Sequence, residues 1–133
     1  DITYKDVLKV QPFANVVGFV ELNGKELLEY LTAVAAKPID SGAFAQFAGV
    51  ELSIEQGVLK TATIKGQDID PAKNYRMAIN SYIASGGDKY PALNKHSSYV
   101  NSGFVDADVL KAYIEKNSPL SAASHDKGNV VRK

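Results

Sequence analysis

Residues 75–91, YRMAINSYIASGGDKYP, begin with apolar strand sequence and change abruptly to paired glycines followed by a carboxylate. The first part predicts a β-strand over 75–80 that leads into a loop. Gly86 and Gly87 allow positive φ angles and close approach of the backbone to a ligand. Asp88 offers two acceptor oxygens, either for a diol or for nearby backbone N–H groups. A loop of this composition is suited to binding a ligand.

Two aromatic residues lie in the same loop. Tyr82 and Tyr90 present flat faces on which a ring could stack. A simpler interpretation of the Gly-Gly-Asp sequence is a tight turn closed by an Asx-type hydrogen bond. The residues alone leave both interpretations open.

Composition restricts the class of protein. The chain has 133 residues, of which 45% are hydrophobic and 23% charged, as expected for one globular domain over residues 1–133. Fifteen basic residues balance fifteen acidic ones, which favours neither nucleic-acid nor membrane-surface binding. The absence of cysteine excludes disulfides and thiolate chemistry. No stretch resembles a signal peptide or a membrane span. Because patterned sequence starts at Asp1, we expect the chain to be part of a longer protein.

Capping signals and periodicity predict the remaining elements. Thr3 with Asp6, and Asn23 with Glu26, have the spacing of capping boxes at helix starts. Gly18 interrupts a β-branched run and indicates a bulge or a close contact. The expected elements are a helix over 4–9, a strand over 15–22, a helix over 23–36, a hairpin of strands over 50–54 and 58–64, a strand over 75–80 and a helix over 106–116.

This order of elements lacks the regular β-α alternation of a doubly wound sheet. It predicts an α+β domain in which helices pack on a mixed β-sheet. We expect Asp106 to cap the last helix, whose apolar face would cover the sheet. Residues 94–103 are expected to be irregular, and residues 118–133 to form a polar C-terminal tail.

Residues 39–49, IDSGAFAQFAG, form loop sequence that carries two phenylalanines among small residues. Phe44 and Phe47 could be ordinary core residues, since most phenylalanines are buried. Their setting among glycines and alanines also suits aromatic rings exposed at a cleft.

Several kinds of catalytic site are missing from the sequence. His96 and His125 are the only histidines, lie in loop sequence without metal-ligand spacing, and are most simply solvated surface residues. No Gly-x-Ser-x-Gly turn, phosphate-binding Gly-x-x-x-x-Gly-Lys or dinucleotide-binding Gly-x-Gly-x-x-Gly occurs. We therefore predict no metal site and no catalytic residues in this chain.

Four segments together resemble a known family. They are DITYKDVLKVQPFAN (1–15), SGAFAQF (41–47), IASGGDKYP (83–91) and GFVDADVLKAYI (103–114). In this order, over nearly the whole chain, they resemble the C-terminal domain of the 5'-nucleotidases. The similarity is greatest to bacterial periplasmic UDP-sugar hydrolase/5'-nucleotidase, or NAD nucleotidase.

The resemblance implies a division of labour between two domains. In that family an N-terminal metallophosphoesterase domain holds two divalent metal ions and cleaves the substrate, while the C-terminal domain binds the base and ribose. It implies that this chain binds a nucleotide such as AMP, a UDP-sugar or NAD beside an N-terminal domain in cis, and that it works in the periplasm. It also implies that the chain holds no cofactor and that the isolated fragment is inactive.

The resemblance also implies site residues. The family holds the base between two aromatic rings, and Phe47, with Phe44 as the alternative, and Tyr82 match their positions. Asp88 matches the acceptor of the ribose hydroxyls, and Gly86 matches the glycine that shapes the backbone beneath it.

Three residues depart from the commoner family pattern Asn-Phe-x-x-x-Gly-Gly-Asp-Gly. Ser81 replaces Asn, Tyr82 replaces Phe, which keeps the stacking face, and Lys89 replaces Gly. If the family glycine has a positive φ, Lys89 would be strained. Neither Arg76 nor Arg132 matches the family's phosphate-contacting arginines, most of which lie upstream of this chain. An alternative function is a free-standing module that binds a nucleoside or a protein and has no catalytic role.

Overall fold

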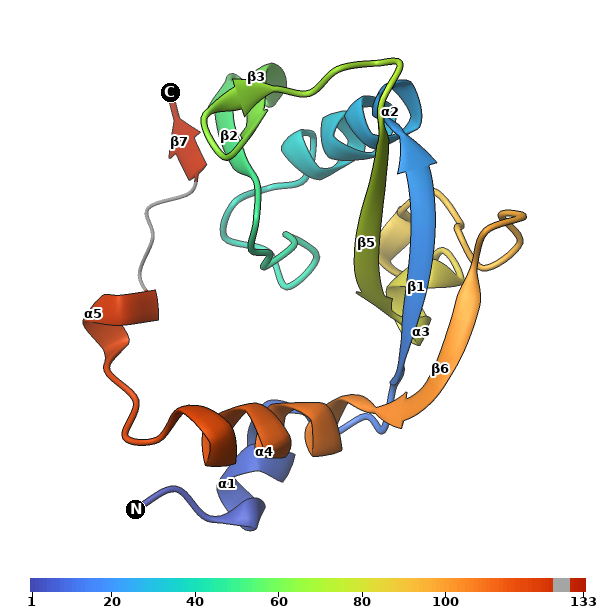
Figure 1. The fold of residues 1–133 in the computed structure, drawn as a ribbon. Helices are drawn as coiled ribbons and strands as arrows, with labels where there is room; N and C mark the ends of the chain where they lie inside the picture. Colours follow the sequence, from blue (N-terminus) through green and yellow to red (C-terminus); the bar gives the residue numbers. More distant parts are fainter. Residues whose placement is uncertain (126–129) are drawn as a thin grey trace.

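The computed structural model describes residues 1–125 and 130–133 (Figure 1). The strands are β1 (Val16–Asn23), β2 (Glu51–Glu55), β3 (Val58–Ile64), β4 (Gln67–Asp68), β5 (Asn74–Asn80), β6 (Val100–Val105) and β7 (Val130–Arg132). The helices are α1 (Tyr4–Val10), α2 (Gly24–Ala35), α3 (Ser81–Ala84), the 3-10 turn η1 (Gly87–Lys89), α4 (Asp106–Asn117) and α5 (Ala122–His125).

The strands form two sheets, of orders β5-β1-β6 and β4-β3-β2-β7. All strand pairs are antiparallel except β2 and β7, which run parallel. The predicted α+β class with mixed β-sheet is confirmed.

β1 is the central strand of the three-stranded sheet, and its side chains alternate between buried and exposed. Gly18, Val20 and Leu22 face the core, whereas Phe19 and Glu21 point to the opposite, exposed side. The pairing of β1 with β6 shifts register next to Gly18, where any side chain would collide with the ring of Tyr99. Gly18 therefore marks both a bulge and a close contact, the two features that the sequence indicated.

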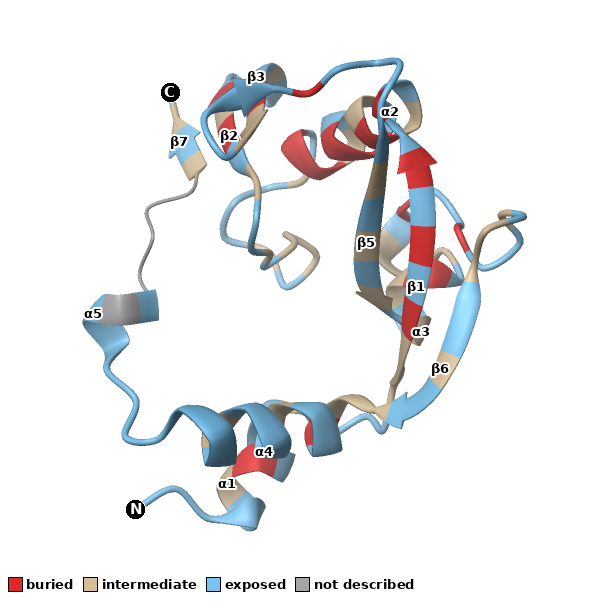
Figure 2. Cartoon of the chain, in the orientation of Figure 1, coloured by how far each residue is buried: buried red, intermediate tan, exposed pale blue. Residues whose placement is uncertain are grey.

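Helix α2 lies between the two sheets and begins with the predicted capping box. The Asn23 side chain accepts a hydrogen bond from the Glu26 N–H (2.8 Å), and Glu26 Oε1 accepts one from the Asn23 N–H (3.1 Å). The helix contacts β1 and β5 of one sheet and β3 of the other, and Figure 2 shows the buried residues of α2 and β1 in red. The buried core consists of Val20, Leu22, Leu27, Tyr30, Leu31, Val34, Ala35, Leu52, Ile54, Ala62, Ile69, Tyr90 and Leu93.

Two segments differ from the expectation. Residues 94–103 are not irregular throughout, because Val100–Val105 form β6 on the free edge of β1. In the predicted tail over residues 118–133, residues 126–129 lie outside the described part of the chain, and Val130–Arg132 form β7, which pairs with β2. Both strands are short and depend on a partner far away in the sequence, so local composition does not reveal them.

The expected role of the last helix is wrong. Val105 rather than Asp106 occupies the N-cap position, without a side-chain bond. Ala107 is the buried residue of α4, while Val109 and Tyr113 remain 43% and 46% exposed. The helix packs on α1 and on the end of β6, away from the face of the sheet (Figure 1).

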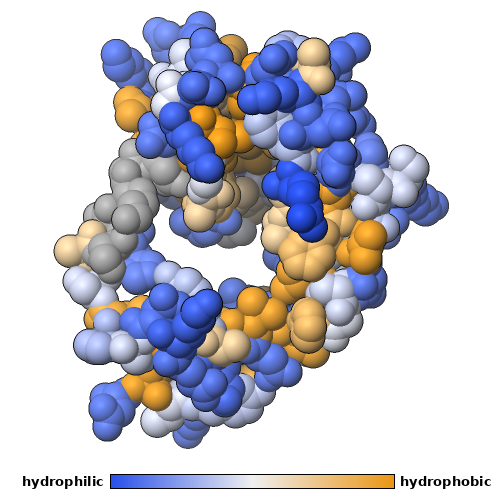
Figure 3. All heavy atoms as spheres, viewed as in Figure 1, coloured by the Kyte–Doolittle hydropathy of each residue, from blue (hydrophilic) through white to orange (hydrophobic). Residues whose placement is uncertain are grey.

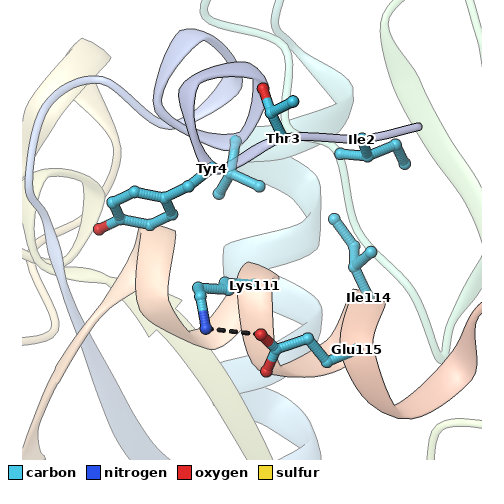
Figure 4. Close-up of a pocket in the computed structure, with 7 residues that line it drawn as sticks. Ile2, Thr3, Tyr4, Lys111, Ile114 and Glu115 are labelled. Atoms are coloured by element: carbon cyan, nitrogen blue, oxygen red, sulfur yellow. Dashed lines mark hydrogen bonds and ion pairs between the residues drawn. The ribbon is translucent and has the colours of Figure 1, made fainter.

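Exposed apolar side chains therefore remain on this side of the molecule. They include Val100 and Phe104 on β6 and Val109 on α4, and Figure 3 shows apolar surface where these two elements meet. A cavity of about 100 Å³ lies between α1 and α4 (Figure 4), lined by Ile2, Thr3, Tyr4, Val7, Lys111, Ile114 and Glu115. None of the helices in the described residues is long and apolar enough to cross a membrane.

We predict that the two amphipathic helices contribute unequally to stability. Leu31→Ala in α2 removes a side chain that is 5% exposed and should lower the free energy of unfolding by about 2–5 kcal/mol. Leu110→Ala in α4, where the side chain is only half-buried, should cost about 1 kcal/mol or less. Urea titration of both variants measures this, and equal losses would contradict the arrangement of α4.

We also predict a pH dependence that originates at the α2 cap. The hydrogen bond from the Asn23 backbone, followed by the one from His96, lowers the pKa of Glu26 below its ordinary value of 4.5. A depressed folded-state pKa contributes stability that is complete above the unfolded value and is lost as pH falls through the folded one. The melting temperature should therefore decrease on acidification below about pH 5 more steeply in the native chain than in Glu26→Gln.

Glu29→Gln is the matched control, because Glu29 lies on the same helix but outside the capping box. It should follow the native curve. Parallel curves for Glu26→Gln and the native chain would show that the Glu26 cap is not the origin of the acid sensitivity.

Candidate functional site

The segment that follows β5 is more ordered than the loop expected from the sequence. Asn80 caps the single turn of α3, its side chain accepting a hydrogen bond from the Ile83 N–H at 2.9 Å. The chain then turns through η1, with a φ of 97° at Gly86, 54° at Asp88 and 62° at Lys89. The positive φ suspected for Lys89 is thus present, and a second non-glycine residue shares it.

The paired glycines have different roles. Gly86 adopts the left-handed conformation that glycine favours. Gly87 packs so closely on Tyr82 that an added Cβ would lie 2.6 Å from the Tyr82 carbonyl oxygen and 2.7 Å from its ring. The turn can therefore form beside the tyrosine ring only with glycine at position 87.

Tyr82 and Asp88, two of the predicted site residues, lie together. The Tyr82 hydroxyl donates a hydrogen bond to Asp88 Oδ1 at 3.2 Å, and the Tyr82 side chain is 51% exposed. Within residues 1–125 and 130–133, the other carboxylate oxygen of Asp88 has no hydrogen bond. The pair presents an aromatic ring and an acceptor oxygen on the surface.

Tyr90 is not the exposed stacking surface that the sequence suggested. It is 4% exposed, and its ring stacks on Tyr30 of α2 with centroids 5.8 Å apart. Its hydroxyl donates a hydrogen bond to the carbonyl of Ala43 at 2.7 Å. Burial raises the pKa of Tyr90, the backbone at Ala45 partly offsets this, and the Asp88 charge raises it further. The hydroxyl therefore stays protonated and able to donate at neutral pH.

The bond from Tyr90 to Ala43 attaches the loop over residues 39–49 to the Gly-Gly-Asp turn. Phe44 and Phe47 of this loop are half-buried and pack against the core. They are therefore neither fully buried core residues nor fully exposed rings. The Arg132 guanidinium lies 4.2 Å from the centroid of the Phe44 ring. Phe44 is thus in contact with a residue of β7.

Lys37, just after the end of α2, is a residue of the site that the sequence analysis did not identify. Its Nζ donates hydrogen bonds to the carbonyls of Asp88 (2.7 Å) and Lys89 (3.3 Å), and lies 4.7 Å from the centroid of the Tyr90 ring. The sequence shows Lys37 only as the residue before Pro38, where the helix must end. Lysine is common near the C-terminal end of a helix. The residues around Lys37 do not indicate that its partner lies fifty-one positions away in the sequence.

The remaining candidates lie elsewhere. His96 is not simply solvated: Ser98 N–H donates to its Nδ1 (3.2 Å), and its Nε2 contacts Glu26 Oε2 (2.8 Å), which joins the loop before β6 to the start of α2. His125 contacts the Tyr113 hydroxyl at 2.8 Å. Arg76 is exposed on β5, opposite Glu21 of β1.

The cavity between α1 and α4 is lined by none of the predicted site residues. A second pocket, of about 360 Å³, is lined by Ile64, Lys65, Gln67, Asp68, Asp70, Lys73 and Tyr75, none of which is a predicted site residue. Among the described residues, no group of three or more His, Cys, Asp or Glu side chains could hold a metal ion. The predicted site residues therefore line neither of these two pockets.

The chain is similar to curated proteins over most of its length. It is 54% identical to Protein UshA of Escherichia coli over 131 residues, which is 98% of this chain and 24% of that protein. It is 53% identical to a 5'-nucleotidase of Vibrio cholerae over 120 residues, which is 90% of this chain and 22% of that protein. The chain thus spans about a quarter of the length of these curated relatives.

Solved structures show the same fold. The 5'-nucleotidase precursor of Thermus thermophilus superposes with a TM-score of 0.82 at 25% identity, over 98% of this chain and 28% of that one. The NAD nucleotidase of Haemophilus influenzae superposes with a TM-score of 0.73 at 25% identity, over 90% of this chain and 25% of that one.

The family model described as "5'-nucleotidase, C-terminal domain" matches residues 1–95, a range that contains every predicted site residue. The family resemblance drawn from the four sequence segments is confirmed. The chain belongs to the family of 5'-nucleotidase C-terminal domains.

Proposed function

We propose that this chain binds the base and ribose of a nucleotide, as the specificity domain of a larger hydrolase that cleaves phosphate ester or diphosphate bonds of nucleotides. The observation that carries the proposal is the pairing of an exposed aromatic ring, Tyr82, with a carboxylate that keeps one acceptor oxygen open, Asp88. The names of the relatives, which include 5'-nucleotidases and an NAD nucleotidase, support a nucleotide as ligand.

The base would stack between Tyr82 and Phe47. Stacking requires a ring face that the protein does not already cover, and Tyr82 is half exposed. Of the two phenylalanines, Phe47 matches the stacking position of the family, and Phe44, whose ring contacts the Arg132 guanidinium, is the alternative. Tyr90 holds the loop of Phe47 close to the turn of Tyr82 through its bond to Ala43.

The ribose would be bound by Asp88. A carboxylate has about four acceptor directions, and the Tyr82 hydroxyl uses one of them on Oδ1. The remaining oxygen can accept hydrogen bonds from a ribose diol, and hydrogen bonds to a charged acceptor are among the stronger ones in proteins.

The hydrolytic chemistry would take place outside this chain. We propose an N-terminal metallophosphoesterase domain in cis with two divalent metal ions, which would polarise the phosphoryl group and activate water. In this proposal the role of this chain is to hold and orient the substrate. By the same family resemblance we propose that the complete enzyme works in the periplasm.

Substitution of the two stacking rings tests the base site. In the complete enzyme, Phe47→Ala and Tyr82→Ala should each raise KM for AMP by the equivalent of about 1–3 kcal/mol, with kcat little changed, because each removes one face of the stack. Steady-state kinetics measure both constants. Phe104→Ala is the matched control, since Phe104 is 65% exposed on β6 and belongs to neither loop of the candidate site. An unchanged KM in Tyr82→Ala would reject the assignment.

Comparison of two sugars tests the ribose site. Asp88→Ala should lose about 1.5–3 kcal/mol of binding to AMP, roughly tenfold to a hundredfold in KM, and much less with 2'-deoxy-AMP. Tyr82→Phe separates the roles, because it keeps the ring face and removes only the hydrogen bond to Asp88. Equal losses for both nucleotides in Asp88→Ala would show that Asp88 only closes the turn.

A further inference from the structure

Asp88 and Lys89 form an unusual pair, because two consecutive non-glycine residues have left-handed backbone conformations, with φ of 54° and 62°. For L-residues with a Cβ, this region is disfavoured, and such residues persist only where the surroundings hold them. Glycine would adopt it freely, but the sequence has lysine at position 89. Some other interaction must therefore stabilise the turn in this shape.

The carbonyl groups of these same two residues converge on one ammonium group. Lys37 Nζ lies 2.7 Å from the Asp88 oxygen and 3.3 Å from the Lys89 oxygen. An ammonium has three hydrogens and no acceptor, so it can donate to both carbonyls at once, and such charge-assisted bonds are stronger than neutral ones.

Lys37 is itself held in place. It follows directly on α2, whose last residues include Val34 at 2% and Ala35 at 0% exposure. Its ammonium also lies 4.7 Å from the centroid of the buried Tyr90 ring, within the range of a cation–π contact. The buried end of α2 and the buried ring of Tyr90 therefore hold the ammonium beside the turn.

We propose that Lys37 is a positioning residue that holds the Asp88–Lys89 backbone in its left-handed conformation and so directs the Asp88 carboxylate towards the ribose. The ammonium of Lys37 donates its hydrogen bonds to backbone carbonyls, so Lys37 would act on the ligand only through Asp88. The second part rests on the proposed function of Asp88, whereas the first part concerns the turn alone.

A cycle of four proteins tests the proposal: the native complete enzyme, Lys37→Met, Lys89→Gly and the double variant. Methionine keeps an unbranched side chain of similar length and removes the charge. Glycine at position 89 adopts the positive φ without help. Lys37→Met should raise KM for AMP about tenfold, with kcat within twofold, and should raise KM for 2'-deoxy-AMP less. Adding Lys89→Gly should restore most of the loss.

Hydrogen–deuterium exchange at the amides of residues 88–90 gives a second readout that needs no substrate. Lys37→Met should speed exchange there about tenfold, and Lys37→Met with Lys89→Gly should bring it back towards the native rate. Lys65→Met is the matched control, because Lys65 also has a positive φ, of 52°, but lies in the turn after β3. It should change neither KM nor exchange in this segment.

The outcomes separate the two proposals. If Lys37→Met changes neither exchange nor KM while Asp88→Ala shows the ribose effect, the role of Lys37 is rejected and the ribose site stands. If exchange responds as expected but KM does not change in any variant, including Asp88→Ala, Lys37 holds the turn and the ribose site is rejected. A loss in Lys37→Met that Lys89→Gly does not reduce would also overturn the proposed mechanism, because the backbone conformation would then not be its cause.

Discussion

The arrangement of the candidate site depends on the burial of Tyr90. Its ring stacks on Tyr30 of α2, its hydroxyl reaches the carbonyl of Ala43, and the ammonium of Lys37 lies over its face. One side chain therefore connects the central helix, the loop of the two phenylalanines and the Gly-Gly-Asp turn. Burial of an aromatic residue with a satisfied hydroxyl combines apolar contact with a directional bond, which fixes both distance and orientation.

Local signals predicted those parts of the fold that form by local interactions. The capping boxes at Thr3 and Asn23 are present as expected, and so is the hairpin of β2 and β3. Strands β6 and β7 were missed because each is stabilised by pairing with a distant strand rather than by its own composition. The apolar spacing in α4 was read as a buried face, yet spacing shows only that a face exists and not what covers it.

The same distinction applies to the site. Tyr82, Asp88 and Gly86 were predicted as site residues because they share one short segment with the family pattern, and the structure brings Tyr82 and Asp88 into contact. Lys37 could not be named, because its partners are backbone carbonyls, which carry no sequence signature. Tyr90 was named for the wrong reason, since a tyrosine beside a turn looks the same in the sequence whether its ring faces solvent or the core.

The contact between Arg132 and Phe44 has a consequence for the order in which the loop over residues 39–49 is completed during synthesis. β7 leaves the ribosome after every other strand and helix described for this chain, and it pairs in parallel with β2, which follows that loop directly. Until β7 has emerged, the ring of Phe44 lacks the guanidinium that lies over it in the finished fold. Removal of β7 would likewise take away the cation that lies over Phe44 in this loop.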